Sequence, residues 1–148
     1  MQFRSNGKLL ITGEYLILDG ALGLSLPTKF GQSMNVSTES RASIKWTSFD
    51  SKNSPWFSAE YDNDLKTIID CTDVGIAEEL KHLFHAAKEL SPLFNPAGCK
   101  VQCKLDFPRN WGLGSSSTLR INMSKWANIS PFELHMATSN GSGYDIAA

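Results

Sequence analysis

The stretch that most constrains this chain is a run of glycine and hydroxyl residues at positions 108–117, Pro-Arg-Asn-Trp-Gly-Leu-Gly-Ser-Ser-Ser, here called the Gly-Ser loop. Before it, apolar and polar residues alternate from Cys99 to Phe107, which predicts a half-buried strand. After it, residues 118–126 follow a helical period. Glycines let the backbone approach a ligand closely, and a helix start presents free N–H groups and a positive dipole end. The loop is therefore predicted to bind an anion such as phosphate.

Spacing separates this interpretation from three alternatives. A flexible Gly/Ser linker rarely sits so tightly between a strand and a helix, and it rarely contains residues as bulky as Trp111 and Leu113. The P-loop requires a lysine directly after its last glycine, whereas the first lysine after Gly114 is Lys125. The dinucleotide-binding fingerprint requires a third glycine where Ser117 stands. The sequence thus favours a phosphate loop of another kind.

Composition narrows the classes of partner. A chain of 148 residues suits one domain with a substantial core. Its formal net charge of -1, without a basic cluster, argues against nucleic acid as a partner. No apolar run approaches the length of a membrane span, and the first residues do not form a secretion signal. Three cysteines, an odd number, favour the reducing cytoplasm over a disulfide framework.

The cysteines and histidines also form two pairs that could suggest a metal site. Cys99 and Cys103, however, fall on the apolar side of the predicted strand, and His82 and His85 lie on an amphipathic helical pattern. Structural zinc sites usually bring cysteines together in tight turns, which this spacing does not favour. We therefore predict buried free cysteines and a surface histidine pair, and assign no zinc.

The remaining pattern predicts an α+β organisation, with several strands first and then helices with one strand between them. A strand over Phe3–Thr12 contains the Asn6-Gly7 turn signal. The clearest helix runs from Asp73 to Leu90, capped by Thr72 or Asp73 and ended by Pro92. Further extended segments are predicted at 21–26, 32–38, 43–49 and 56–61, and a short helix opens at Ser130-Pro131 with Ser130 as its cap.

Three separated segments together resemble a known family. They are residues 7–15 (Gly-Lys-Leu-Leu-Ile-Thr-Gly-Glu-Tyr), the Gly-Ser loop, and residues 141–147 (Gly-Ser-Gly-Tyr-Asp-Ile-Ala). In this order they resemble the GHMP kinases, the superfamily of galactokinase, homoserine kinase, mevalonate kinase and phosphomevalonate kinase. The match is closest to mevalonate-pathway members with a Gly-Tyr-Asp-Ile-Ala signature, which stands here at 143–147. Over essentially the whole chain, the resemblance implies a ribosomal-protein-like two-layer α/β sandwich with a mixed sheet and helices on one face.

The resemblance also implies an activity and its residues. It implies an ATP- and Mg²⁺-dependent cytoplasmic phosphotransferase acting on a small metabolite, with mevalonate or phosphomevalonate as the expected acceptor. Lys8 matches a lysine close to the transferred phosphoryl group, and Asp145 matches the aspartate that accepts the proton of the substrate hydroxyl. Ser116 matches the loop serine that ligates Mg²⁺. The residues expected to wrap the nucleotide phosphates are Trp111, Gly112, Leu113, Gly114, Ser115, Ser116 and Ser117.

Two acidic residues match the family motifs less well. The better-matched residues also have simpler structural interpretations. Glu14 matches a first-motif glutamate that orients neighbours or substrate, and Glu133 is a weak candidate for a second Mg²⁺ ligand. Taken alone, Lys8 would be a solvated strand residue, Asp145 an Asx cap in a turn, and the loop serines helix caps. Their occurrence together in family order favours the functional interpretation.

The resemblance also departs from the family in length. The family is generally about twice this long, with two domains and an active site between them. Its third glycine-rich signature is absent from this sequence. Residues 1–148 are therefore expected to be the N-terminal domain without its C-terminal partner, and to self-associate through surface that the partner would cover. A non-catalytic nucleotide-binding fragment and a diphosphomevalonate decarboxylase-like enzyme remain as alternatives.

Overall fold

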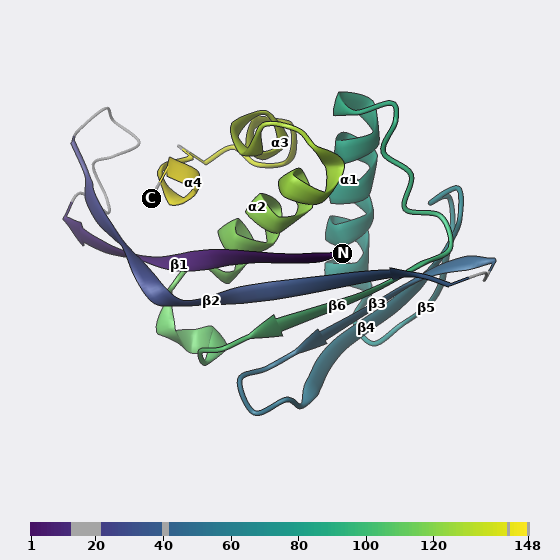
Figure 1. Cartoon of the computed structure of the whole chain (residues 1–148), viewed down its shortest axis with the longest axis horizontal. Helices are drawn as coiled ribbons and strands as arrows, with labels where there is room; N and C mark the ends of the chain where they lie inside the picture. The colour runs from purple at the N-terminus through teal and green to yellow at the C-terminus, as the bar shows by residue number, and fades with distance from the viewer. Residues whose placement is uncertain (13–21, 40–41, 142, 148) are drawn as a thin grey trace.

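The computed structural model describes residues 1–12, 22–39, 42–141 and 143–147. They form two layers, a six-stranded sheet and a set of helices that cover one of its faces (Figure 1). The strands are β1 (Gln2–Thr12), β2 (Leu24–Thr38), β3 (Ser43–Phe49), β4 (Pro55–Asp62), β5 (Ile68–Cys71) and β6 (Cys99–Leu105). The helices are α1 (Val74–Leu90), α2 (Ser115–Ala127), α3 (Pro131–Thr138) and α4 (Tyr144–Ala147), with a 3-10 turn, η2 (Arg109–Trp111), before α2.

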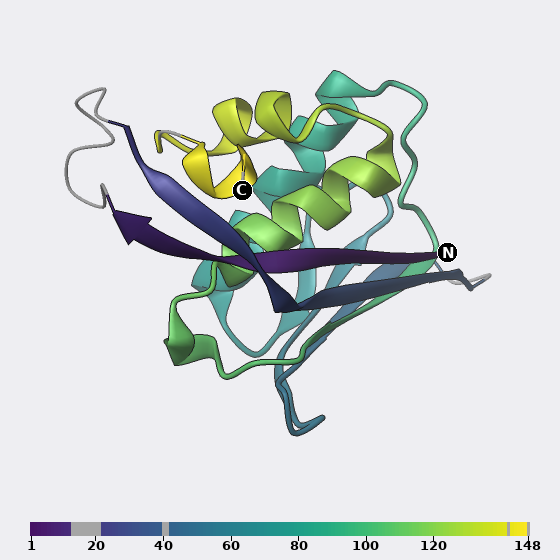
Figure 2. The same cartoon turned by 60° about the vertical axis from the view of Figure 1, so that its left-hand side comes forward.

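The sheet is mixed. Its strands lie in the order β1-β2-β6-β3-β4-β5, and β3 runs parallel to β6 while the other neighbours are antiparallel. Figure 2 shows the helices gathered on the same side of the sheet from a second direction. The predicted α+β fold, with a mixed sheet and helices on one face, is confirmed.

Helix α1 packs its buried face against the sheet. It begins after Asp73, whose carboxylate accepts a hydrogen bond from the N–H of Ile76 at 3.0 Å, and it ends at Leu90, two residues before Pro92. Its Phe84 is fully buried and meets the rings of Trp46, Tyr61 and Trp126 edge-on, with centroids 5.8, 6.1 and 6.1 Å away. The predicted helix and its Asp73 cap are confirmed.

Three details of the predicted elements differ. The Asn6-Gly7 signal marks a register shift within continuous β1 and not a turn. The extended segments at 21–26 and 32–38 fall largely on one strand. Strand β2 pairs with β1 from Leu24 to Asn35 and with β6 from Gln32 to Thr38, and it continues through Pro27, which lies opposite Lys8. Helix α3 begins at Pro131, but the Ser130 side chain makes no capping hydrogen bond.

The cysteines of β6 face the core. Cys99 and Cys103 are buried and free, and burial raises the pKa of both thiols. On α1, His82 is exposed, whereas the Nε2 of His85 lies 3.0 Å from the carbonyl oxygen of Leu65. Within the described ranges, no group of three or more His, Cys, Asp or Glu residues is placed to hold a metal ion.

A buried polar network fixes α2 to the sheet. The Ser5 hydroxyl donates to Asn122 Oδ1 at 2.7 Å, and Asn122 Nδ2 donates to the backbone carbonyl of Gln32 at 2.9 Å. The Thr118 hydroxyl lies 2.9 Å from Gln32 Oε1, so the first turns of α2 are held against β2. These contacts determine where the N-terminus of α2 points.

Asn122→Ala is expected to lower the free energy of unfolding by about 2–3 kcal/mol, because it leaves buried polar partners unpaired and opens a small cavity. Urea unfolding followed by circular dichroism would measure this. The control is Asn35→Ala, which removes an exposed amide from β2 and should change stability by less than about 0.5 kcal/mol. Equal stability of the two variants would contradict the structural role of the network.

Candidate functional site

The Gly-Ser loop connects β6 to α2. After the turn η2, Gly112 and Gly114 adopt positive φ angles of +68° and +77°. Gly114 is the residue before α2, and the first turn of α2 contains no acidic side chain. The strand, loop and helix therefore follow one another as the sequence predicts, with the N-terminus of α2 directly after the second glycine.

Strand β1 lies directly against this loop. The backbone N–H of Lys8 donates to the carbonyl of Leu113 at 3.0 Å. A Cβ atom at Gly7 would lie only 2.7 Å from that same carbonyl oxygen, so glycine permits the close approach of the two segments. The Lys8 side chain runs alongside the second loop glycine, since a Cβ on Gly114 would lie 3.3 Å from Lys8 Cε. The first two motifs are thus in contact.

The third motif reaches the same place through α4. Lys8, which is only 8% exposed, donates from Nζ to the Tyr144 hydroxyl at 2.9 Å and lies 4.4 Å from the centre of its ring. Asp145 follows Tyr144 in α4, but its side chain lies outside the described part of the chain, as does the whole of Glu14. Both figures place α4 above β1, near the end of the chain.

A cavity of about 390 Å³ opens beside the loop, between α2 on one side and α1 with β3 and β4 on the other. Ser115 and Ser116 line its loop side. Arg109 lies across the ring of Trp56, with its guanidinium carbon 3.6 Å from the ring centre. The remaining lining residues are Gln32, Trp46, Ser48, Phe57, Ile76, Glu79, Leu80, His82, Leu83, Leu105, Leu119, Arg120 and Thr138.

One buried donor in this cavity wall has no partner. Among the described residues, Trp56 Nε1 is buried and makes no hydrogen bond to any protein atom. An unpaired buried N–H costs free energy, and this nitrogen is shielded, so it is not open to a ligand in the cavity. The cavity therefore combines partly apolar walls with a helix N-terminus at one end.

The predicted loop residues divide into two groups. Ser115 and Ser116 face the cavity, whereas Ser117 is buried and its hydroxyl donates to the carbonyl of Gly114 at 2.9 Å. Leu113 is buried, and the half-exposed Trp111 packs edge-on against Phe30 with ring centroids 5.6 Å apart. Backbone groups, Ser115 and Ser116 are thus available to a ligand, while Ser117 and Leu113 hold the loop in shape.

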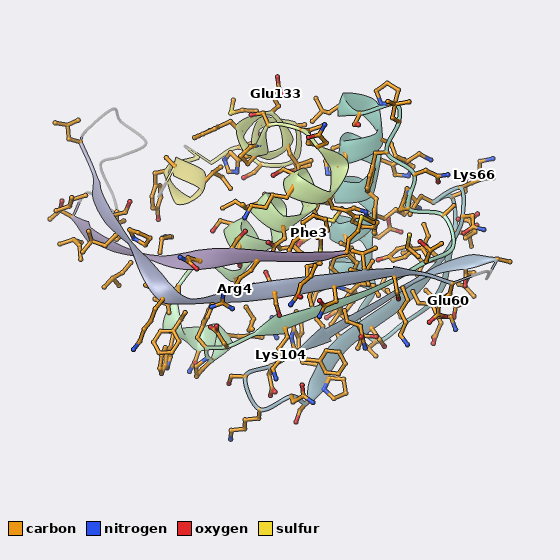
Figure 3. All side chains as sticks on the ribbon, in the orientation of Figure 1. Phe3, Arg4, Glu60, Lys66, Lys104 and Glu133 are labelled. Atoms are coloured by element: carbon orange, nitrogen blue, oxygen red, sulfur yellow. The ribbon has the colours of Figure 1, made fainter. Side chains whose placement is uncertain are left out.

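Glu133 lies apart from this group. It is exposed on α3, and Figure 3 shows its side chain pointing away from α2 and the sheet. The assignment of Glu133 as a second Mg²⁺ ligand stays a prediction. Mg²⁺ commonly binds through one or two protein oxygens together with substrate phosphates and water, so the Ser116 hydroxyl beside a phosphate loop fits such a role.

Sequence reasoning missed several residues of the site. Trp56 and Arg120 belong to no motif, and Arg109 lies within the Gly-Ser loop but was given no role there. All three line one cavity only in the folded chain. His135 is a fourth case, since it is buried in α3 with Nε2 3.1 Å from the carbonyl oxygen of Gly141. Gly143, at a φ of +75°, packs directly on the same imidazole. The ring thereby supports the turn that leads into α4.

Comparison with known proteins places the fold among kinases. No family model matches the sequence, and no curated protein matches it as a relative. Solved structures do match. The mevalonate kinase of Methanococcus jannaschii aligns with a TM-score of 0.68 and 15% identity over 93% of this chain and 44% of its own. The phosphomevalonate kinase of Streptococcus pneumoniae, in complex with phosphomevalonate and AMPPNP, aligns with a TM-score of 0.67 and 19% identity over 99% of this chain and 46% of its own.

A third match is the galactokinase of Lactococcus lactis in complex with galactose, with a TM-score of 0.65 and 16% identity over 99% of this chain and 38% of its own. These neighbours are kinases of the GHMP family. The chain spans less than half the length of each of the three. At such low identity the likeness shows the fold alone, which this chain shares with part of each of these three kinases. None of the described helices is long and apolar enough to cross a membrane.

Proposed function

We propose that this chain forms the nucleotide-binding part of a GHMP-type small-molecule kinase. The observation that carries the proposal is the contact of Lys8 with both the Gly-Ser loop and α4, together with a cavity that Ser115 and Ser116 of the same loop line. Because the chain spans less than half of the solved kinases that share its fold, we place the acceptor side of the cleft outside residues 1–148.

In this proposal the nucleotide lies along the cavity. The phosphates accept hydrogen bonds from the backbone N–H groups and serine hydroxyls at the start of α2, where the helix dipole favours negative charge. The flat base enters the apolar part of the cavity, which the Trp56 side chain helps to line. Bound ATP and Mg²⁺ supply the transferable phosphoryl group and part of the charge neutralisation, with the Ser116 hydroxyl as a metal ligand.

The chain's own residues contribute position and charge. Phosphoryl transfer depends mainly on alignment and on neutralising charge that spreads over the phosphoryl oxygens. Lys8 provides a cation next to the loop, and its contact with Tyr144 fixes the direction of the ammonium group. Asp145 accepts the proton of the attacking hydroxyl, and its place directly after Tyr144 puts its backbone near the lysine.

The acceptor we propose is mevalonate or phosphomevalonate, because residues 143–147 carry the Gly-Tyr-Asp-Ile-Ala sequence. We place this metabolic kinase in the cytoplasm, in keeping with its free cysteines. Measuring ATP consumption with mevalonate, phosphomevalonate, homoserine and galactose tests this choice of phosphoryl acceptor. Release of carbon dioxide together with phosphoryl transfer would instead assign a diphosphomevalonate decarboxylase-like reaction.

Nucleotide binding is the first test of the proposal. Isothermal titration calorimetry with Mg²⁺ is expected to show ATP binding at least about tenfold more tightly than adenosine, because most contacts are to phosphate. Failure of the unmodified chain to bind ATP, or equal affinity for ATP and adenosine, would refute the placement.

A further inference from the structure

Arg120 is a second cation beside the Gly-Ser loop, and no motif of the sequence singles it out. It lies one helical turn after Ser116 on α2, and helical side chains lean back toward the N-terminus of their helix. Its Nη1 accordingly lies 3.5 Å from the Ser116 carbonyl oxygen, and its Nε donates to the Thr138 hydroxyl at 3.3 Å. The guanidinium therefore lies at the first turn of α2, in the wall of the cavity.

We propose that Arg120 binds the phosphate chain of the nucleotide, on the side of the loop opposite Lys8. This inference rests on the proposed function, since it assigns a further binding residue to the same site. Lys8 flanks Gly114 from β1, whereas Arg120 reaches the loop from within α2, beside α3. A triphosphate held at the helix start would then meet positive charge from two directions.

A phosphate oxygen would be a better acceptor for the Arg120 guanidinium than the Ser116 carbonyl. The contact between Arg120 Nη1 and that carbonyl oxygen is long for a hydrogen bond, at 3.5 Å. Guanidinium bonds to phosphate are shorter, at about 2.7–2.9 Å, and roughly twice as strong as bonds between neutral groups.

The local charge supports the same assignment. The first turn of α2 has no acidic residue. Around the cavity, the charged or titratable side chains besides Arg120 are Arg109, Glu79 and His82, and the last two come from α1 on the facing wall. Arg109 is engaged with the ring of Trp56. Arg120 is thus the lining cation that lies against the first turn of α2.

Arg120 also contacts α3. The Thr138 hydroxyl donates to the Leu134 carbonyl at 2.7 Å, so its oxygen is oriented to accept from Arg120 Nε, 3.3 Å away. This contact places the Arg120 side chain on the α3 side of α2.

Two substitutions separate charge from packing. Arg120→Gln keeps a donor and much of the side-chain length but removes the charge, whereas Arg120→Lys keeps the charge and removes the planar fork. Titration with ATP, adenosine and inorganic tripolyphosphate should show Arg120→Gln weakening ATP and tripolyphosphate by roughly 10- to 100-fold, with adenosine unchanged. Arg120→Lys should weaken the binding of ATP and tripolyphosphate clearly less than Arg120→Gln does.

The control is Lys66→Ala, which removes a charge from an exposed side chain far from the loop. It should change the affinity for ATP by less than about 2-fold (Figure 3).

The outcomes are distinct. Equal ATP affinity of the unmodified chain and Arg120→Gln overturns the inference and leaves the proposed function standing. A proportional loss of adenosine affinity in Arg120→Gln, or equal losses in the glutamine and lysine variants, assigns Arg120 a packing role and also overturns it. If the unmodified chain binds neither ATP nor tripolyphosphate, the proposed function itself fails.

Discussion

Gly114→Ala is expected to weaken ATP binding by roughly 100-fold or more, the equivalent of two lost charge-assisted hydrogen bonds. Gly114 has a φ of +77°, and an added Cβ would lie 2.6 Å from Ser117 Oγ and 3.3 Å from Lys8 Cε. Either the loop or both neighbouring side chains must move. The movement would misdirect the N–H groups at the start of α2 and displace Lys8, which are the two features expected to hold the phosphates.

Gly112→Ala is the matched control for Gly114→Ala. Gly112 has a similar φ of +68°, but an added Cβ there would meet no atom within 4 Å. Both variants therefore carry the backbone cost of a left-handed alanine, about 1–2 kcal/mol, and only Gly114→Ala adds the collision. Calorimetric titration with ATP, together with urea unfolding of each variant, separates the two effects. Similar ATP affinities for the two variants would show that the contact of Lys8 and Ser117 with the loop has no part in binding.

The loop was predictable because its signals are local. Alternating residues from Cys99, two glycines and a helical period fall within one short stretch, and strand, loop and helix follow in that order. The Asp73 cap of α1 was predictable for the same reason. By contrast, β5 spans only Ile68–Cys71 at the edge of the sheet, too few residues for a period to emerge.

The cavity was not predictable, because its walls come from separate parts of the chain. Trp56 is an ordinary strand aromatic until the fold places it in one cavity wall with residues of α1 and the loop. Arg120 is an ordinary helix residue until α3 places Thr138 beside it. The approach of Lys8 to the loop depends on Gly7, whose missing side chain matters only because Leu113 lies opposite. Pattern reasoning alone would leave Lys8 as a strand residue, and the family resemblance was what singled it out.

Asp145→Asn is expected to lower phosphoryl transfer by about 10²- to 10⁴-fold, the usual contribution of a general base, while ATP affinity changes by less than about 2-fold. Asparagine has nearly the shape of aspartate but cannot accept the proton of the acceptor hydroxyl. Turnover of ATP by the complete protein with mevalonate or phosphomevalonate, beside calorimetric titration, measures both quantities. Asp70→Asn, which alters an exposed carboxylate on β5, is the control and should leave both unchanged. Parallel losses of turnover and ATP affinity in Asp145→Asn would show that Asp145 supports the fold of α4 or the binding of nucleotide, and would refute its assignment as the base.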